Sequence, residues 1–449
     1  MGTVEKRDFN KMLDTPMPKL ILSLSIPTII SMLITNVYNL VDAYFVGNLG
    51  TSATGAIGIV LSLQAILQAF GFMFGHGAGS IISRKLGARD KEDASRYAST
   101  SFFYSFGAGA LIGVFLLVFL NPCLRFLGCT ESILPYARSY AIYILLAAPF
   151  VTSSCTLNNI LRYEGKASLA MVGLASGGIL NMVGDPILMF GCHLGMDGAG
   201  LSTALSQLIS FLLLLFMFIS GKSESKIRFS FVTKRPTEVV NILKNGFPSM
   251  LRQGLNSVST MLLNQSAHVY GDTAIAAMSI VNRISMFIVA IVIGLGQAFQ
   301  PVAAYNYGAK KYKRVREAYV FTFKVAESFL VVIVVLGFVF AAPIVAVFQK
   351  DPEVVRIGKA AMHFQCLSLA LQPISVYANM MFQSIGKSLI ASILASLRSG
   401  VFFIPIILIL PRIIGLTGIE CAQTVADLLT TFTSIPFVIH FLRELKVKQ

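Results

Sequence analysis

The chain has 449 residues, of which 55% are hydrophobic and only 13% are charged, and its formal net charge is +15. Soluble domains carry about 25% charged residues, so this composition excludes an ordinary water-soluble protein. Runs of roughly 20 mainly apolar residues recur along the chain, and each is long enough to cross a hydrocarbon core of about 30 Å. We therefore predict an all-α polytopic membrane protein.

The apolar runs predict twelve transmembrane helices in two groups of six. They divide the chain into an N-terminal lobe (residues 1–220), a cytoplasmic linker (221–237) and a C-terminal lobe (238–449). The predicted spans are, in order, 18–46, 53–82, 97–120, 132–157, 167–191, 199–220, 238–268, 274–304, 317–346, 353–383, 388–410 and 418–442.

Lysine and arginine are unevenly distributed between alternate loops. Most lie in the two termini, the linker and every second loop, whereas the opposite loops hold only Arg125, Lys350 and Arg412. Because the side rich in lysine and arginine faces the cytoplasm, both termini are predicted to be cytoplasmic, in a plasma (inner) membrane. The positive charge is thus a topology signal, and we expect no nucleic-acid partner.

The two halves of the sequence resemble each other at a shift of 221 residues, which drifts to 220 near the ends. Parallel repeats of this kind occur in secondary transporters that alternate access around a central site, so transport is favoured over a channel or a structural bundle. The matching segments are Ile26-Pro27 with Phe247-Pro248, Leu86-Gly87-Ala88-Arg89 with Tyr307-Gly308-Ala309-Lys310, Gly165-Lys166 with Gly386-Lys387, and Gly195 and Gly198 with Gly415 and Gly418.

Polar residues inside the first-half spans form stripes. Tyr38 and Asp42 are four apart, as are Asn181 and Asp185, so each pair shares a helix face. An intramembrane acid costs about 2.5–3.5 kcal/mol on insertion scales and usually faces a bundle interior or a wet cavity. We therefore predict a functional role for Asp42 and Asp185. Further polar positions are Tyr140 and Asn158 in the fourth span and Thr203 in the sixth.

The repeat makes these acids asymmetric. At the 221 shift Asp42 corresponds to Leu263 and Asp185 to Ile406. The seventh span instead carries a neutral stripe that includes Gln253 and Asn256. We therefore expect the two halves to differ in function. The roles of the remaining interior charges stay open: Arg252, Arg283, Glu327, Arg398 and Asp427.

Motifs for catalysis or nucleotide binding are missing. The stretch GHGAG, residues 75–79, lacks the Gly-Lys-Ser/Thr of a phosphate loop, and neither H-E-x-x-H nor G-x-S-x-G occurs. We therefore predict no enzyme activity, no cofactor and no structural metal, and we expect an ion gradient as the energy source.

The sequence resembles the multidrug and toxic compound extrusion (MATE) family along nearly its whole length. The segments that carry the resemblance are IPTIISMLITNVYNLVDAYFVGNLG, NMVGDPILMFG, GLSTALSQ and the paired loops LGARDKEDA and YGAKKYKRV. The resemblance implies a V-shaped pair of lobes and a monomeric antiporter that exports organic, often cationic drugs in exchange for H+ or Na+.

The resemblance also implies roles for single residues. Members with an acidic first lobe bind the coupling cation through positions that match Asp42, Asn181, Asp185 and Thr203, with Asn158, Tyr38 and Tyr140 nearby. We add Gln253 and Asn256 as cavity residues. Members with acids in the seventh and tenth helices are a poorer match, because the tenth span has only Glu353 at its start. Two alternatives stay open: a flippase for lipid-linked oligosaccharides on a related fold, and a membrane receptor or scaffold without transport.

Overall fold

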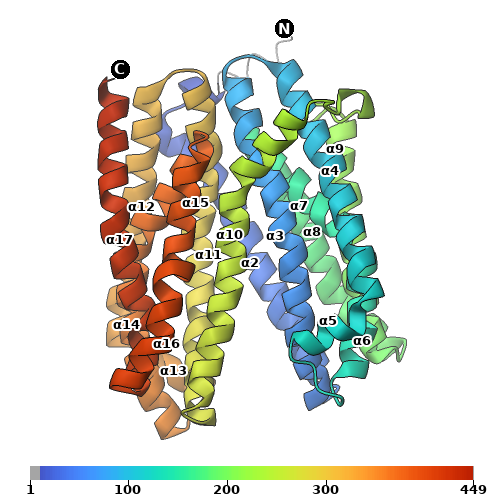
Figure 1. Ribbon diagram of the computed structural model, residues 1–449, viewed down its shortest axis with the longest axis vertical. Helices are drawn as coiled ribbons and strands as arrows, with labels where there is room; N and C mark the ends of the chain where they lie inside the picture. The colour runs from blue at the N-terminus through green and yellow to red at the C-terminus, as the bar shows by residue number, and fades with distance from the viewer. Residues whose placement is uncertain (1–10, 448–449) are drawn as a thin grey trace. The chain divides into compact units, whose positions relative to one another are not determined.

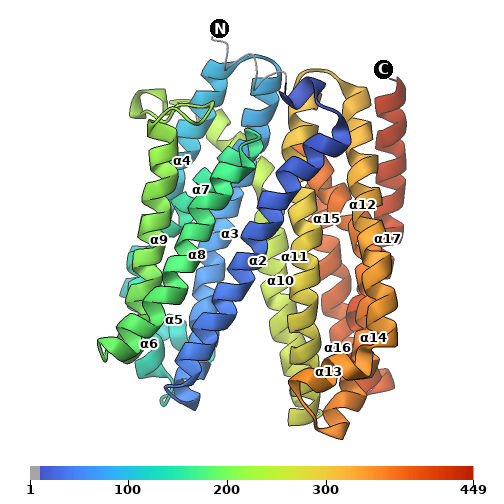
Figure 2. The same ribbon diagram turned by 180° about the vertical axis from the view of Figure 1, so that it is seen from behind.

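The computed structural model describes residues 11–447, and this part of the chain is helical with no strand (Figure 1, Figure 2). It confirms the predicted all-α fold. The first-half helices are α2 (Met17–Gly47), α3 (Thr51–Gly87), α4 (Lys91–Val118), α5 (Leu120–Phe126), α6 (Leu134–Leu146), α7 (Ala148–Tyr163), α8 (Ala167–Pro186), the π-helix η1 (Ile187–Gly191) and α9 (Gly195–Ile219). They are followed by the short 3-10 helix η2 (Phe229–Phe231), α10 (Pro236–His268), α11 (Asp272–Gly308), α12 (Tyr312–Val339), α13 (Ala341–Phe348), α14 (Pro352–Ser384), α15 (Ser388–Ser396), the π-helix η3 (Leu397–Phe402), α16 (Phe403–Ile414) and α17 (Leu416–Val447).

Most of these helices can span a bilayer. Within residues 11–447, nine helical segments are long and apolar enough, and the bent pair α6–α7 makes a tenth. The two other predicted spans correspond to α10 and α14, which have 33 residues each and are about 50 Å long at 1.5 Å per residue. Both helices carry more polar residues, such as Arg252 and Gln253 in α10.

The internal repeat has a structural counterpart. Helices α3 and α11 both have 37 residues and start 221 positions apart, at Thr51 and Asp272, and α4 and α12 both have 28. The loop between α3 and α4 turns in the same way as the loop between α11 and α12, because Arg89 and Lys310 take left-handed backbone angles, with φ of 65° and 60°. Each half therefore repeats one helical plan.

The described chain packs as two compact units. The N-unit comprises residues 23–250, and the C-unit comprises residues 11–22 and 251–447. The units divide inside α2 and inside α10, so the chain passes from one to the other within a helix. The lobe boundaries drawn from the sequence, at 220 and 238, stay a prediction.

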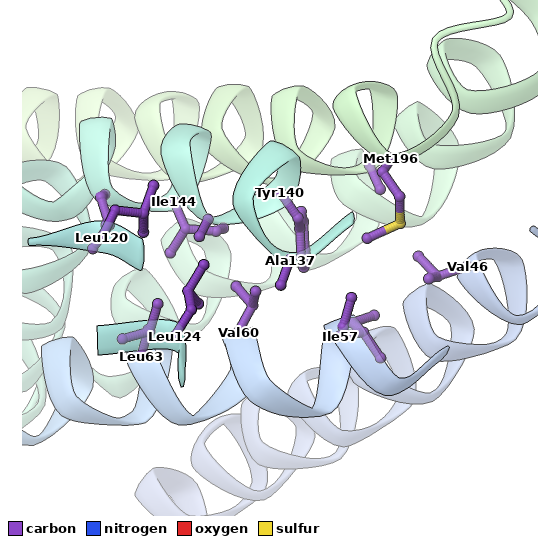
Figure 3. Packing of buried hydrophobic residues seen from close by; sticks show 14 of the residues in the cluster. Val46, Ile57, Val60, Leu63, Leu120, Leu124, Ala137, Tyr140, Ile144 and Met196 are labelled. Atoms are coloured by element: carbon purple, nitrogen blue, oxygen red, sulfur yellow. The ribbon is translucent and has the colours of Figure 1, made fainter. Parts of the chain in front are cut away.

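A hydrophobic core inside the N-unit fixes the helices that carry the site. Figure 3 shows side chains of this core from α2, α3, α5, α6 and α9, with Tyr140 among them. Helix α9 packs against α6 and α8, and Figure 2 shows α8 and α9 side by side. The labelled members of the core are Val46, Ile57, Val60, Leu63, Leu120, Leu124, Ala137, Tyr140, Ile144 and Met196.

The first part of α10 lies directly on α3 within the N-unit. A Cβ atom at Gly246 would stand 1.7 Å from the Met73 carbonyl oxygen, and one at Gly77 would stand 2.1 Å from the Ile242 carbonyl oxygen. Beside this contact the Nδ1 atom of His76 lies 2.7 Å from the hydroxyl oxygen of Ser249. Only glycine allows the two helix backbones to approach this closely.

The linker is also part of the N-unit. Glu164, just after α7, is buried, and its carboxylate accepts hydrogen bonds from the Ser223 hydroxyl (2.7 Å) and from the backbone N–H groups of Glu224 (2.8 Å) and Ser225 (2.9 Å). Burial raises the pKa of Glu164, although donors from Ser225, Ser223 and Glu224 oppose the shift. The linker thus covers the Glu164 carboxylate and supplies its hydrogen-bond donors.

In the C-unit, α14 packs against α11, α12 and α17. The segment 11–22 joins this unit through α11 and α12, since Asn306 donates to the Met12 carbonyl (3.2 Å) and Arg314 donates to the Thr15 carbonyl (2.7 Å). The start of α2, the first helix of the first half, therefore packs in the C-unit, and the start of α10, the first helix of the second half, packs in the N-unit.

Candidate functional site

Helix α2 brings Asp42 into the interior of the N-unit. The side chain is only 4% exposed, although the residue lies in a helix of mainly apolar sequence. Tyr38, one turn earlier, is buried on the same side. Its ring lies against α8, because a Cβ atom at Gly178 would stand 3.1 Å from it.

Helices α8 and α9 supply three more polar side chains, and all three are buried. The Asn181 amide donates to Asp185 Oδ1 (3.0 Å) and to the hydroxyl oxygen of Thr203 (3.1 Å). The first bond joins residues four apart on one helix face, as the sequence predicts. The second bond ties α8 to α9.

Tyr140 on α6 closes the network. Its hydroxyl donates to Asp42 Oδ2 (2.9 Å) and lies 3.2 Å from the Thr203 hydroxyl oxygen. The predicted span 132–157 is not one straight helix here, because α6 and α7 meet at an angle of 54° around Ala147, and Pro149 lies in the first turn of α7. Proline lacks a backbone donor, which favours such a break.

The two acids meet across this network. Asp42 accepts from the Tyr140 hydroxyl, which lies 3.2 Å from the Thr203 hydroxyl oxygen, and the Asn181 amide donates to both Thr203 and Asp185. Two carboxylates buried in one network repel each other when both are charged. A proton shared between them, or a cation bound by both, removes the repulsion.

Three oxygen atoms of the network have no hydrogen-bond partner in the described structure: Asp42 Oδ1, Asn181 Oδ1 and Asp185 Oδ2, all buried. Buried polar atoms are nearly always paired, so three unpaired acceptors in one place call for an explanation. Carboxylate and amide oxygens are the ligands that hard cations take. The arrangement is therefore chemically suited to a cation or a proton.

The other predicted site residues lie outside this network. The Asn158 amide donates to the Ala170 carbonyl (2.8 Å), and its repeat counterpart Asn379 makes the same bond to Ala391 (2.6 Å). This bond fastens the end of one helix to the start of the next in both halves. A cavity role for Asn158 stays a prediction.

Gln253 and Asn256 belong to the C-unit. Gln253 is half-buried and Asn256 is exposed. Their backbone carbonyls accept hydrogen bonds from the hydroxyls of Ser257 and Thr260, one turn later. Their predicted place in a cavity also stays a prediction.

The sequence reasoning missed two features. Ser202 joins the network, because its hydroxyl donates to the Asn181 carbonyl (3.3 Å). The adjacent Thr203 was predicted from its polar position in the sixth span and from the family resemblance, and neither of these pointed to Ser202. The second feature is an ion pair between Arg398 and Asp427 in the C-unit, which the sequence shows only as two separate interior charges.

Comparisons with known proteins agree on one family. The family model described as MatE matches residues 27–187 and 248–409. The chain is 32% identical to Multidrug export protein MepA of Staphylococcus haemolyticus over 95% of its length and 94% of the relative, and 29% identical to the Staphylococcus aureus protein of that name over 96% and 95%.

Solved structures lead to the same family. One of them, the outward-facing conformation of a multidrug resistance MATE family transporter, superposes with a TM-score of 0.91 at 26% identity. The similarity covers 97% of this chain and 98% of that one. The family matches fall on both repeats, and the relatives are matched along almost their full length. The chain therefore belongs to the MATE family of multidrug efflux transporters.

Proposed function

We propose that this transporter exports organic, often cationic drugs by antiport with H+ or Na+, and that the cation binds at Asp42 and Asp185. The drugs are its partners, and it acts as a monomer by alternating access in the plasma membrane, with both termini in the cytoplasm. The flippase alternative has no comparable support, because the named relatives are multidrug export proteins.

The observation that carries the proposal is the set of three unpaired oxygens among Asp42, Asn181 and Asp185. In a packed protein interior, an unpaired acceptor loses the hydrogen bonds it would make in water. A cation placed between the two carboxyl groups would satisfy these atoms. A proton on one of these oxygens would remove one charge and supply a donor to another of the three acceptors.

The coupling follows from where the ligands are attached. Asp42 belongs to α2, Tyr140 to α6, Asn181 and Asp185 to α8, and Thr203 to α9. Filling the site draws these helices together, and emptying it restores the repulsion between the acids. A cation can shift the conformational equilibrium only by its different affinity for the two states. A drug that prefers the cation-free state is then released when the cation binds.

Ethidium efflux from cells or proteoliposomes tests the proposal, with Na+ and H+ gradients applied separately. Asp42→Asn and Asp185→Asn keep the side-chain size but remove the charge, and each is expected to abolish gradient-driven efflux. Asp197→Asn is the matched control, because Asp197 lies exposed at the start of α9 and accepts a hydrogen bond from Ser139 (2.5 Å).

The gradient that drives wild-type efflux identifies the coupling ion. Unchanged gradient-driven efflux in both acid variants would refute the cation site. A folded wild-type protein that moves no cationic dye but transfers a lipid-linked sugar would favour the flippase.

A further inference from the structure

The C-unit contains a buried carboxylate whose surroundings contrast with those of Asp42 and Asp185. Asp427 on α17 is fully buried. Arg398, in the π-helix η3, donates from Nε to Asp427 Oδ1 (2.7 Å) and from Nη2 to Oδ2 (3.4 Å). Gln423 donates to Oδ1 (3.0 Å), and the Ser368 hydroxyl donates to Oδ2. Both oxygens of Asp427 therefore have partners.

The internal repeat relates this cluster to the site in the N-unit. At the shift of 220 that aligns Gly195 with Gly415, Gln423 corresponds to Thr203. Asp427 lies one helical turn after Gln423 on α17. The helices that hold the cluster, α14, η3 and α17, are the repeat counterparts of those that carry Tyr140, Asn181 and Thr203. Asp427 itself corresponds to Gln207 on α9, one turn after Thr203, so each half holds a buried acid among corresponding helices without placing the acids at corresponding positions.

The acid cluster of the C-unit differs from the site of the N-unit in containing a positively charged side chain, Arg398. In the N-unit, two acids and an amide leave three oxygens unpaired. In the C-unit, one acid is neutralised by a guanidinium, and its oxygens accept four hydrogen bonds. Arg398 has a side chain that is 22% exposed, against 1% for Asp427, so the arginine covers the acid from its more open side.

We infer that Arg398 is a tethered cation, which neutralises the buried acid of the C-unit as the exchanged cation neutralises the acids of the N-unit. Asp427 is then a latent site for a monovalent cation or a proton, and it opens only when Arg398 is removed. This inference rests on the proposed function of Asp42 and Asp185. It explains why one chain with two similar halves exchanges cations in only one of them.

The chemistry of the latent site follows from the groups that face Asp427. They are Arg398 from η3, Ser368 from α14 and Gln423 from its own helix. Without Arg398, the carboxylate keeps two neutral partners and no positive charge. A buried carboxylate in that state is stabilised by a proton or by a metal cation. Arginine cannot lose its charge in a protein, so the native pair stays closed at any physiological pH.

The test uses the full chain in detergent and in proteoliposomes. The background is Asp42→Asn/Asp185→Asn, in which cation-dependent stabilisation at the N-unit site should be absent. Adding Arg398→Met, which keeps a long side chain without charge, is expected to restore a rise in unfolding temperature of several degrees with Na+ or with falling pH, because a ligand that binds only the folded state stabilises it. Separate Na+ and pH titrations identify the ligand. Adding Asp427→Leu should abolish the rise, and Arg398→Lys should not produce it.

A second arm covers the case in which Arg398→Met does not fold. The neutral double variant Arg398→Met/Asp427→Leu, with the N-unit acids intact, should export ethidium with an unchanged number of cations per drug. A folded double variant with an altered ratio would overturn the inference, and so would a folded Arg398→Met background variant that responds to neither Na+ nor pH. The proposed function is judged separately, since it fails if Asp42→Asn and Asp185→Asn leave gradient-driven efflux unchanged.

Discussion

Tyr140→Phe removes a single hydroxyl from the centre of the proposed cation site. That hydroxyl donates to Asp42 Oδ2 at 2.9 Å, and Asp42 Oδ1 already has no partner. The variant therefore leaves both oxygens of a buried carboxyl group without a donor. A hydrogen bond to a charged group contributes about 1.5–3 kcal/mol, and this is the expected loss in free energy of unfolding.

The loss can be measured as a melting temperature in detergent without coupling cation. For a unit of about 150–250 residues, each kcal/mol shifts the midpoint by about 2–4 °C, so a decrease of about 3–12 °C is expected. The decrease should shrink at saturating cation, because the bound ion supplies Asp42 with a partner. Tyr143→Phe is the matched control, since Tyr143 lies on the same helix and its hydroxyl is not part of the hydrogen bonds that join Asp42, Tyr140, Thr203 and Asn181. Equal stability of Tyr140→Phe and wild type, or an equal loss in Tyr143→Phe, would refute the reasoning.

Two further predictions concern the packing of the N-unit. Burial raises the pKa of Glu164 above its ordinary value of 4.5. The folded protein therefore binds a proton at this carboxyl group more tightly than the unfolded chain does. The free energy of unfolding should then decrease as the pH rises from about 4.5 towards the raised pKa. Glu164→Gln should remove this part of the pH dependence, and identical slopes in melting temperature against pH would contradict the assignment. Gly246→Ala should destabilise strongly, by about 1–3 kcal/mol or more, because its Cβ would overlap the Met73 carbonyl. Gly254→Ala, on the same helix with open space around it, should be neutral or stabilising in the same unfolding assay, and equal effects would exclude the close contact as the cause.

Helical periodicity was sufficient to predict which polar residues share a face. Asn181 and Asp185 are stacked because they are four residues apart, and this needs no knowledge of the fold. Apolar length likewise predicted the helical class. The meeting of Asp42 with Tyr140 and Thr203 is different, because those residues lie on helices far apart in the sequence. Only the family resemblance indicated that they come together, and their roles stay predictions.

Other features depend on packing that the sequence does not display. Pro149 favours the bend at Ala147, but the length of the apolar run predicts a single unbroken span across it. The partner of Asp427 could not be chosen among Arg252, Arg283 and Arg398, since all three are interior basic residues with similar surroundings in sequence. In the structure Arg398 of η3 donates to Asp427, whereas Arg252 donates to Asn379.

The attachment of the linker has a practical consequence for protein engineering. Residues 223–233 look like a polar connection in which a tag or a protease site could be inserted freely. Their backbone and side chains are instead bonded to the N-unit, at Glu164 and at Ser99 and Thr100 of α4. An insertion there would take hydrogen-bond donors away from a buried carboxylate. The loop at residues 349–351, between α13 and α14, is exposed and offers a safer position for a reporter.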